Sequence, residues 1–186
     1  MRKAASGKKF DLKSFPVNFG LNQLFMKTII LFFLLWVSIE VIAQNEIVGK
    51  VINVIDGNTL EVKGADNQTQ RLVLAGIDSP ELGQEFGDKA KKFLEKIMMD
   101  EDVQVRISGK DRWGNYIAVV MKGKTDPRVE LLEEGLAWTS EKNPDPEFES
   151  IRLKALEKGR GLWKEQNPTP PWIYRRQQSM LQAKSN

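Results

Sequence analysis

The chain has 186 residues, a length that allows one domain with a substantial core, and it contains neither Cys nor His. These absences exclude disulfides, thiolate or imidazole metal ligands and His bases, so the chemistry of any site must come from carboxylates, Arg, Lys, Tyr or hydroxyls. The formal charge is +3, but six of the 28 basic and two of the 25 acidic residues lie in the first 43 positions, which leaves −1 on the rest and no bulk positive field.

Residues 1–43 have the features of a leader rather than of a folded domain. Met26 and Lys27 precede a mostly apolar run over residues 29–37, and residues 41–43 end in Ala43, a small residue suited to signal-peptide cleavage. The run is shorter than the ~20 apolar residues of a spanning helix. We therefore expect a secreted or periplasmic protein that starts at Met1 or Met26; the alternative is membrane anchoring by an uncleaved leader.

Short strands dominate the first half of the body. Residues 48–55 are rich in β-branched side chains and end at a turn, residues 59–63 alternate in polarity, and residues 71–75 form a short apolar run. After a helical segment, residues 103–107 alternate again and residues 116–121 complete a fifth strand.

Helical spacing marks three segments. It predicts helices over residues 84–98, 129–134 and 145–158, the last two ending at Gly135 and Gly159. Residues 167–172 contain three Pro and predict an extended strap, and residues 175–186 are polar and predicted to fray.

Five short strands with a helix after the third predict an α+β fold that is mainly β barrel. We expect a five-stranded Greek-key barrel of the OB type with about three packed helices. The predicted domain covers residues 46–175, followed by a polar C-terminal tail over residues 176–186.

The segment of residues 71–81 carries charges at both ends of an apolar strand. Arg71 begins it, and Asp78 and Glu81 lie just past its end. A guanidinium can bind phosphate oxygens while carboxylates ligate a hard cation, so these residues are candidates for a metal and phosphate site. The alternative is an Arg paired with a carboxylate at a barrel rim.

Five motifs occur in a fixed order at residues 56–60, 71–81, 111–115, 134–137 and 161–163. With their spacing, they resemble the staphylococcal (micrococcal) nuclease family over about residues 46–175. The resemblance implies an OB-type barrel and a calcium-dependent phosphodiesterase, an endonuclease that acts on DNA and RNA.

Four positions match the family in kind. The resemblance implies that Arg71 clamps the phosphate, Asp78 ligates calcium, Ser79 ligates it through its backbone carbonyl, and Glu81 activates water. This chemistry is sensible, because a hard cation and a guanidinium stabilise the charge that develops on phosphorus oxygens.

Two positions depart from the family pattern. Asn58 stands where the family has a second Asp calcium ligand, and Asn115 stands where it has a second Arg. These changes predict weakened calcium binding and weakened hydrolysis. Asp56 and Arg112 are candidates for partial compensation; the alternatives are a turn-closing side chain for Asp56 and a solvated turn residue for Arg112.

Trp113 and Tyr116 are candidates for stacking on bases, and packing is an equal alternative for Tyr116. The leading interpretation is an exported, calcium-dependent nuclease that acts on DNA or RNA, with a single strand as the expected substrate. We expect a monomer without a stable protein partner. The alternatives are a catalytically inactive nucleic-acid-binding module and a protein-interaction module.

Overall fold

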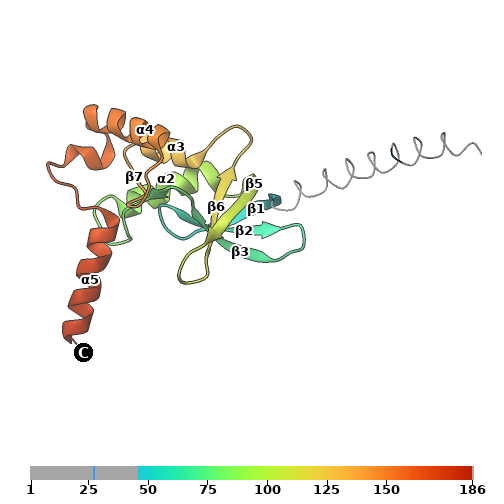
Figure 1. Cartoon of the computed structure of the whole chain (residues 1–186), viewed down its shortest axis with the longest axis horizontal. Helices are drawn as coiled ribbons and strands as arrows, with labels where there is room; N and C mark the ends of the chain where they lie inside the picture. Colours follow the sequence, from blue (N-terminus) through green and yellow to red (C-terminus); the bar gives the residue numbers. More distant parts are fainter. Residues whose placement is uncertain (1–26, 28–45, 186) are drawn as a thin grey trace, which may run out of the picture. The chain divides into compact units, whose positions relative to one another are not determined.

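The computed structural model describes Lys27 and residues 46–185 (Figure 1). The chain divides into two compact units, Met1–Gln44 and Asn45–Asn186, and the features below belong to the second. The predicted leader, including its apolar run and cleavage position, lies outside the described residues. Within the part that the structure describes, no helix is both long enough and apolar enough to cross a bilayer.

Five strands close into a barrel in the order β1-β2-β3-β6-β5. Neighbouring strands are antiparallel except β3 and β6, which are parallel. This arrangement confirms the predicted OB-type barrel of the α+β class. The strands are β1 Glu46–Val54, β2 Thr59–Gly64, β3 Thr69–Leu74, β5 Asp102–Lys110 and β6 Tyr116–Met121.

The core fills the barrel and extends beneath the helices. Alternation along the strands directs one set of side chains inward, and the register places Leu60 opposite Leu72. Both side chains are almost fully buried, as are Val51, Val105 and Val120. Burial of each such side chain stabilises the fold by about 1.5–3 kcal/mol relative to exposure.

Helices and a small sheet cover one side of the barrel (Figure 1). Asp126 and Asp145 cap two of the helices by accepting bonds from backbone N–H groups, and a Pro follows each cap. The elements are β4 Ile77–Asp78 paired with β7 Trp138–Thr139, α2 Gly87–Met98, α3 Pro127–Glu133, α4 Pro146–Glu157, a 3-10 helix Gly161–Lys164 and α5 Pro171–Ser185.

Two predicted elements need correction. The helix expected from residue 84 begins at Gly87, because Phe86 adopts a left-handed conformation with φ of 67°. The fraying expected over residues 175–186 is wrong, because α5 continues to Ser185. Pro170 and Pro171 initiate this helix, since proline is favoured in a first helical turn where its missing N–H has no partner to lose.

Glu149 of α4 ties the small sheet to the helices. Its carboxylate accepts bonds from Thr139 Oγ1 at 2.8 Å and from Arg152 Nε and Nη2 at 2.9 and 2.6 Å. The hydrogen bond from Arg152 is the main cause that lowers the pKa of Glu149 below its ordinary 4.5. β7 is thereby held beside the pairing strand β4, which carries Asp78.

We expect Glu149→Gln to lower the free energy of unfolding by about 1–3 kcal/mol at neutral pH, because hydrogen bonds to a charged group are lost. Since the folded-state pKa is lowered, this stabilisation is present above the unfolded pKa and disappears as the pH falls through the folded value. Urea unfolding at pH 7 and near pH 3 measures both effects. Glu147→Gln, exposed on the same helix, is the control, and equal effects of the two changes at pH 7 would contradict the assignment.

Candidate functional site

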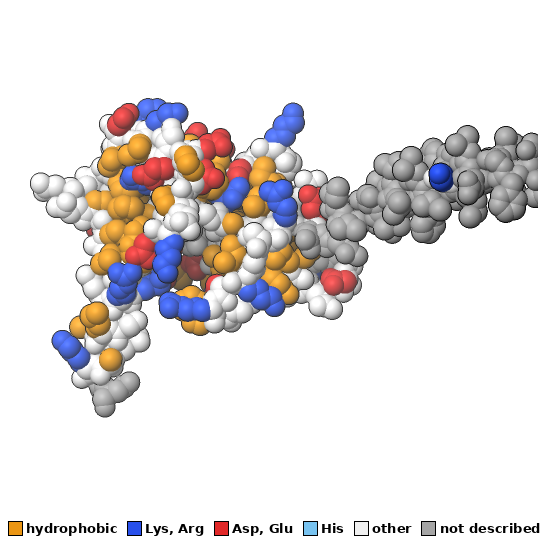
Figure 2. Space-filling view, viewed as in Figure 1, with side chains coloured by type: hydrophobic (Ala, Val, Ile, Leu, Met, Phe, Trp, Pro, Cys, Tyr) orange, Lys and Arg blue, Asp and Glu red, His pale blue; other side chains and the backbone are white. Residues whose placement is uncertain are grey.

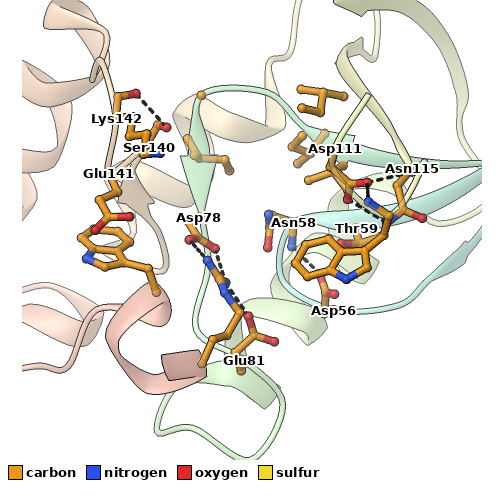
Figure 3. A pocket seen from close by; sticks show the side chains of 18 of the residues that line it. Asp56, Asn58, Thr59, Asp78, Glu81, Asp111, Asn115, Ser140, Glu141 and Lys142 are labelled. Atoms are coloured by element: carbon orange, nitrogen blue, oxygen red, sulfur yellow. Dashed lines mark hydrogen bonds and ion pairs between the residues drawn. The ribbon is translucent and has the colours of Figure 1, made fainter. Parts of the chain in front are cut away.

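An open groove of about 830 Å³ lies between one end of the barrel and α5. Turns, strand ends and a helix that are distant in the sequence all contribute to it, and Figure 3 shows several of these side chains directed into it. The polar and aromatic lining residues are Asp56, Asn58, Thr59, Arg71, Asp78, Glu81, Asp111, Trp113, Asn115, Ser140, Glu141, Lys142, Trp172 and Arg175.

Asp78 and Glu81 converge on one cationic group at the centre of this groove. The Arg175 guanidinium donates from Nη1 and Nη2 to both oxygens of Asp78, at 3.0 and 2.7 Å, and from Nη1 to Glu81 Oε1 at 2.6 Å. Asp78 lies at the end of β4 and Glu81 in the loop that follows (Figure 3). The fold therefore brings two carboxylates together around a single positive charge.

Burial and pairing act in opposite directions at this cluster. Burial raises the pKa of the Asp78 carboxyl above its ordinary value, although its bonds with Arg175 oppose that shift. The hydrogen bond with Asp78 is the main cause that raises the pKa of Arg175. The side chain of Asp78 is 17% exposed, so it is stabilised as an anion by a nearby cation rather than by water.

The first turn of α5 positions Arg175. The Trp172 ring packs edge-on against Trp138 of β7, with 5.7 Å between the ring centroids. Tyr174 Oη donates to the Gly83 carbonyl in the loop after Glu81, at 3.4 Å. These contacts join the helix to β7, which pairs with the strand that carries Asp78, and to the loop that follows Glu81.

Arg71 lies on β3, and its side chain is exposed in the groove. It is paired across the strands with Glu61, but within the described residues its side chain makes no hydrogen bond or ion pair. The structure therefore does not show the alternative in which Arg71 is paired with a carboxylate at the barrel rim. The Arg71 guanidinium is available to an anionic ligand.

Asn58 and Asp56 lie in the turn between β1 and β2. Asp56 Oδ1 accepts from the Asn58 N–H at 3.0 Å, which is the turn-closing role. Asn58 Oδ1 accepts from the Ser79 N–H at 3.4 Å, and Ser79 Oγ donates to the Gly57 carbonyl at 3.0 Å. A Cβ at Gly57 would lie 2.6 Å from that of Ser79, so this close approach requires glycine.

Asn115 and Asp111 lie in the turn between β5 and β6. The Asn115 amide donates to Asp111 Oδ2 at 2.8 Å, and Asp111 Oδ1 accepts from the backbone N–H groups of Trp113 and Asn115. Asn115, which stands where the family has a second Arg, therefore stabilises this turn through its bonds with Asp111. Both side chains face the groove (Figure 3).

The two stacking candidates differ in position. Trp113 is 69% exposed and lines the groove, with the Arg112 guanidinium 4.1 Å from its ring centroid. Tyr116 is half-buried against the core, under Lys110, and does not line the groove. The structure therefore supports packing, rather than stacking on bases, for Tyr116.

A second groove of about 570 Å³ runs along α5 and shares four lining residues with the first: Glu141, Lys142, Trp172 and Arg175. Arg112, Arg176 and Met180 also line it. Arg176 is paired with Glu141 at 2.7 Å, whereas Arg112 stacks on Trp113. Basic side chains gather near the start of α5 in Figure 2, which supplies a local patch on a body without bulk positive charge.

The donor set suits a hard divalent cation in kind but is small. Asp78 and Glu81 already share one cation, and carboxylate oxygens are the ligands that calcium prefers. Asn58 offers an amide oxygen in the same groove. Among the described residues, no group of three or more acidic side chains is arranged to hold a metal ion.

The sequence did not point to Arg175, Asp111 or Glu141 as groove residues. Arg175 lies 97 residues from Asp78, and no local pattern joins them. The two prolines before Trp172 were the available signal, because they indicate a helix start that would have given Arg175 a fixed position.

A family model described as "Staphylococcal nuclease homologue" matches residues 71–165. A Haemophilus influenzae protein named "Uncharacterized endonuclease" is 33% identical over 135 residues, which cover 72% of this chain and 76% of the relative. The "Micrococcal nuclease" of Shigella flexneri is 31% identical over 140 residues, covering 69% and 80%. "Protein ParB" of Escherichia coli is 30% identical over 149 residues, covering 74% and 84%. The matched family region ends before α5.

Proposed function

Because the chain belongs to the staphylococcal nuclease family, we propose that it is an exported, calcium-dependent nuclease that hydrolyses phosphodiester bonds of DNA or RNA. The observation that carries the proposal is the convergence of Asp78 and Glu81 in one groove with the guanidinium of Arg71, which has no ion-pair partner among the described residues. A cation site and a phosphate-binding group in one groove are the two parts that phosphodiester hydrolysis needs.

In this proposal, Asp78 and Glu81 hold the cation, with Asn58 and the Ser79 backbone as neutral oxygen donors. The bound cation supplies Lewis-acid stabilisation of the charge that develops on the phosphate oxygens. Asn58 contributes no charge, and the affinity of calcium sites follows the number of charged ligands. We therefore propose a calcium site weaker than one with Asp at that position.

The side chains have separate tasks. Arg71 binds the phosphodiester through two parallel N–H···O bonds, which a guanidinium can form and an ammonium cannot. Glu81 orients and deprotonates the attacking water, since only one of its oxygens is bonded to Arg175. The groove is open, so a strand can pass through it while one phosphate lies at Arg71.

A single strand is the proposed substrate form, because its bases are free to stack. We expect Trp113→Ala to weaken binding of a single-stranded oligonucleotide by about 5- to 150-fold, the effect of losing one stacked base. Fluorescence anisotropy in chelator measures this without cleavage. Trp113→Phe keeps a ring and should bind within a few fold of the wild type; equal binding by the Ala and Phe variants would contradict the stacking role.

We also propose that residues 1–43 are a leader cleaved after Ala43 and that the mature protein acts as a monomer outside the cytoplasm. The apolar run and the small residue at its end support this proposal. Mass spectrometry of protein recovered from the medium or periplasm should give an N-terminus at Gln44. Recovery of full-length protein in the membrane fraction would support the anchored alternative instead.

A second candidate function is a binding module that has lost the chemistry. It is favoured by the bond between Asn115 and Asp111, which leaves that turn without a guanidinium. Its test is the paired change Asn58→Asp with Asn115→Arg. Cleavage only by this variant would identify the natural protein as a binding module.

The experiment that tests the proposed function is incubation of the purified protein with single-stranded DNA and with RNA, in calcium and in chelator. We expect shortened products only with calcium. Equal amounts of product in calcium and chelator would overturn metal-dependent hydrolysis. Binding without products in any divalent ion would support the binding module.

A further inference from the structure

Among the described residues, Arg175 is the one guanidinium that contacts both Asp78 and Glu81. It comes from α5, beyond the region that the family model matches. The position where the family has its second Arg is Asn115, whose amide is bonded to Asp111. The groove thus has two arginines: Arg71 lies at its family-motif position, whereas Arg175 comes from an element outside the family motifs.

A divalent cation and Arg175 need the same oxygen atoms. Arg175 bonds to both oxygens of Asp78 and to one of Glu81. A divalent cation bound at these oxygens would repel the guanidinium, so we expect cation binding to release it. Its helix stays in place, because Trp172 and Tyr174 join α5 to β7 and to the loop after Glu81.

A released Arg175 remains tethered inside the groove that also contains Arg71. A divalent cation would take over the neutralisation of Asp78 and Glu81, so these two carboxylates would no longer offset the charge of Arg175. A phosphodiester carries one negative charge and gains a second as it is attacked. The released guanidinium is therefore a second donor, beside Arg71, for the charge that the substrate develops.

We propose that Arg175 is the second phosphate-binding arginine of this site, held on Asp78 and Glu81 until a divalent cation takes those carboxylates. This inference rests on the proposed nuclease function. It assigns to α5 the guanidinium that is missing from the β5–β6 turn, where Asn115 stands at the family's Arg position. Arg175 thus contributes to the site twice, first as a cation that holds the carboxylates together and then as a donor to the phosphate.

Two consequences of replacing Arg175 have opposite directions. In Arg175→Ala, calcium loses its competitor, and its affinity measured by isothermal titration calorimetry should rise about 3- to 30-fold, the range for loss of a charged hydrogen-bonded pair. The same variant should cleave single-stranded DNA about 10²- to 10³-fold more slowly, as when one transition-state donor is removed. Arg106→Ala, an exposed Arg on β5 outside both grooves, should change neither.

Two further variants separate a chemical role from a structural one. Arg175→Lys keeps the charge without the planar fork and should recover part of the cleavage rate. Asn115→Arg should raise cleavage more in the Arg175→Ala background than in the wild type, because it restores the missing guanidinium from the family position. Circular dichroism checks that each variant keeps its helical content.

Several results would overturn the proposal. Unchanged calcium affinity in Arg175→Ala would show that the arginine does not compete with the cation. Tighter calcium binding with unchanged or faster cleavage would make Arg175 an inhibitory contact only. If the wild type cleaves nothing, the proposed nuclease function fails, but the role of Arg175 can still be tested by binding. A phosphorothioate single strand should then bind Arg175→Ala about 5- to 100-fold more weakly than the wild type in calcium, and equal binding would overturn the role.

Discussion

Replacing Glu81 by Gln should reduce cleavage of single-stranded DNA by about 10²- to 10⁴-fold, which is the usual contribution of a general base. Gln keeps the size and the hydrogen-bonding oxygen but cannot accept a proton at neutral pH. It also weakens the pairing with Arg175, since the bond at 2.6 Å loses its charged acceptor. The measurement is the initial cleavage rate at saturating calcium, so that loss of metal affinity does not contribute.

Glu157→Gln is the matched control, because it makes the same chemical change at an exposed position on α4. It should cleave at the wild-type rate. A Glu81→Gln protein that cleaves as fast as this control would remove Glu81 from the chemistry. Cleavage would then need a different base.

The second large effect is expected at Arg71. Arg71→Ala should lower the cleavage rate by about 10²- to 10³-fold, because a charge-assisted donor to the phosphate oxygens is lost. Little change in folding stability is expected, since the side chain is exposed and makes no ion pair within the described part of the chain. Cleavage rates and thermal unfolding of the same preparations separate the two effects.

Arg71→Lys distinguishes the shape of the guanidinium from its charge. Lys supplies a point charge without the bidentate fork, so we expect a rate between those of the wild type and Arg71→Ala. Equal rates for wild type and Arg71→Ala would contradict the phosphate-binding role. A large fall in melting temperature for Arg71→Ala would instead show that the residue stabilises the barrel.

The barrel could be predicted because its signals are local. Alternation, β-branched content and short apolar runs indicated the five strands, and the predicted strand over residues 116–121 coincides with β6. β4 and β7 are only two residues long each and carry no periodic pattern, so they could not be found. α5 was missed because its polar composition concealed a helix whose clearest sign is the pair Pro170 and Pro171.

The candidate site was predictable where it follows from one segment. Arg71, Asp78 and Glu81 were singled out from a single stretch of sequence, and the structure places all three in one groove. Asn58 and Asn115 also line it, whereas Tyr116 and Arg112 do not line this groove. Arg175 could not be found, because its contact with Asp78 depends on how α5 packs against β7.

The groove also shows how a fold can keep two carboxylates close together. Without a partner, Asp78 and Glu81 would repel one another, and burial already raises the pKa of Asp78. Arg175 offsets that repulsion through three bonds. In the proposed mechanism, a divalent cation would have to overcome the free energy of these three bonds in order to displace the guanidinium.

The rate of single-strand cleavage as a function of free calcium, in the wild type and in Asp78→Asn, tests the central claim most directly. If Asp78 and Glu81 hold the cation on which hydrolysis depends, the wild type responds saturably to calcium and is inactive in chelator. Asp78→Asn should then need at least tenfold more calcium for half-maximal rate, since a charged ligand is lost. Calcium curves that coincide for the two proteins, or cleavage that persists in chelator, would contradict the account.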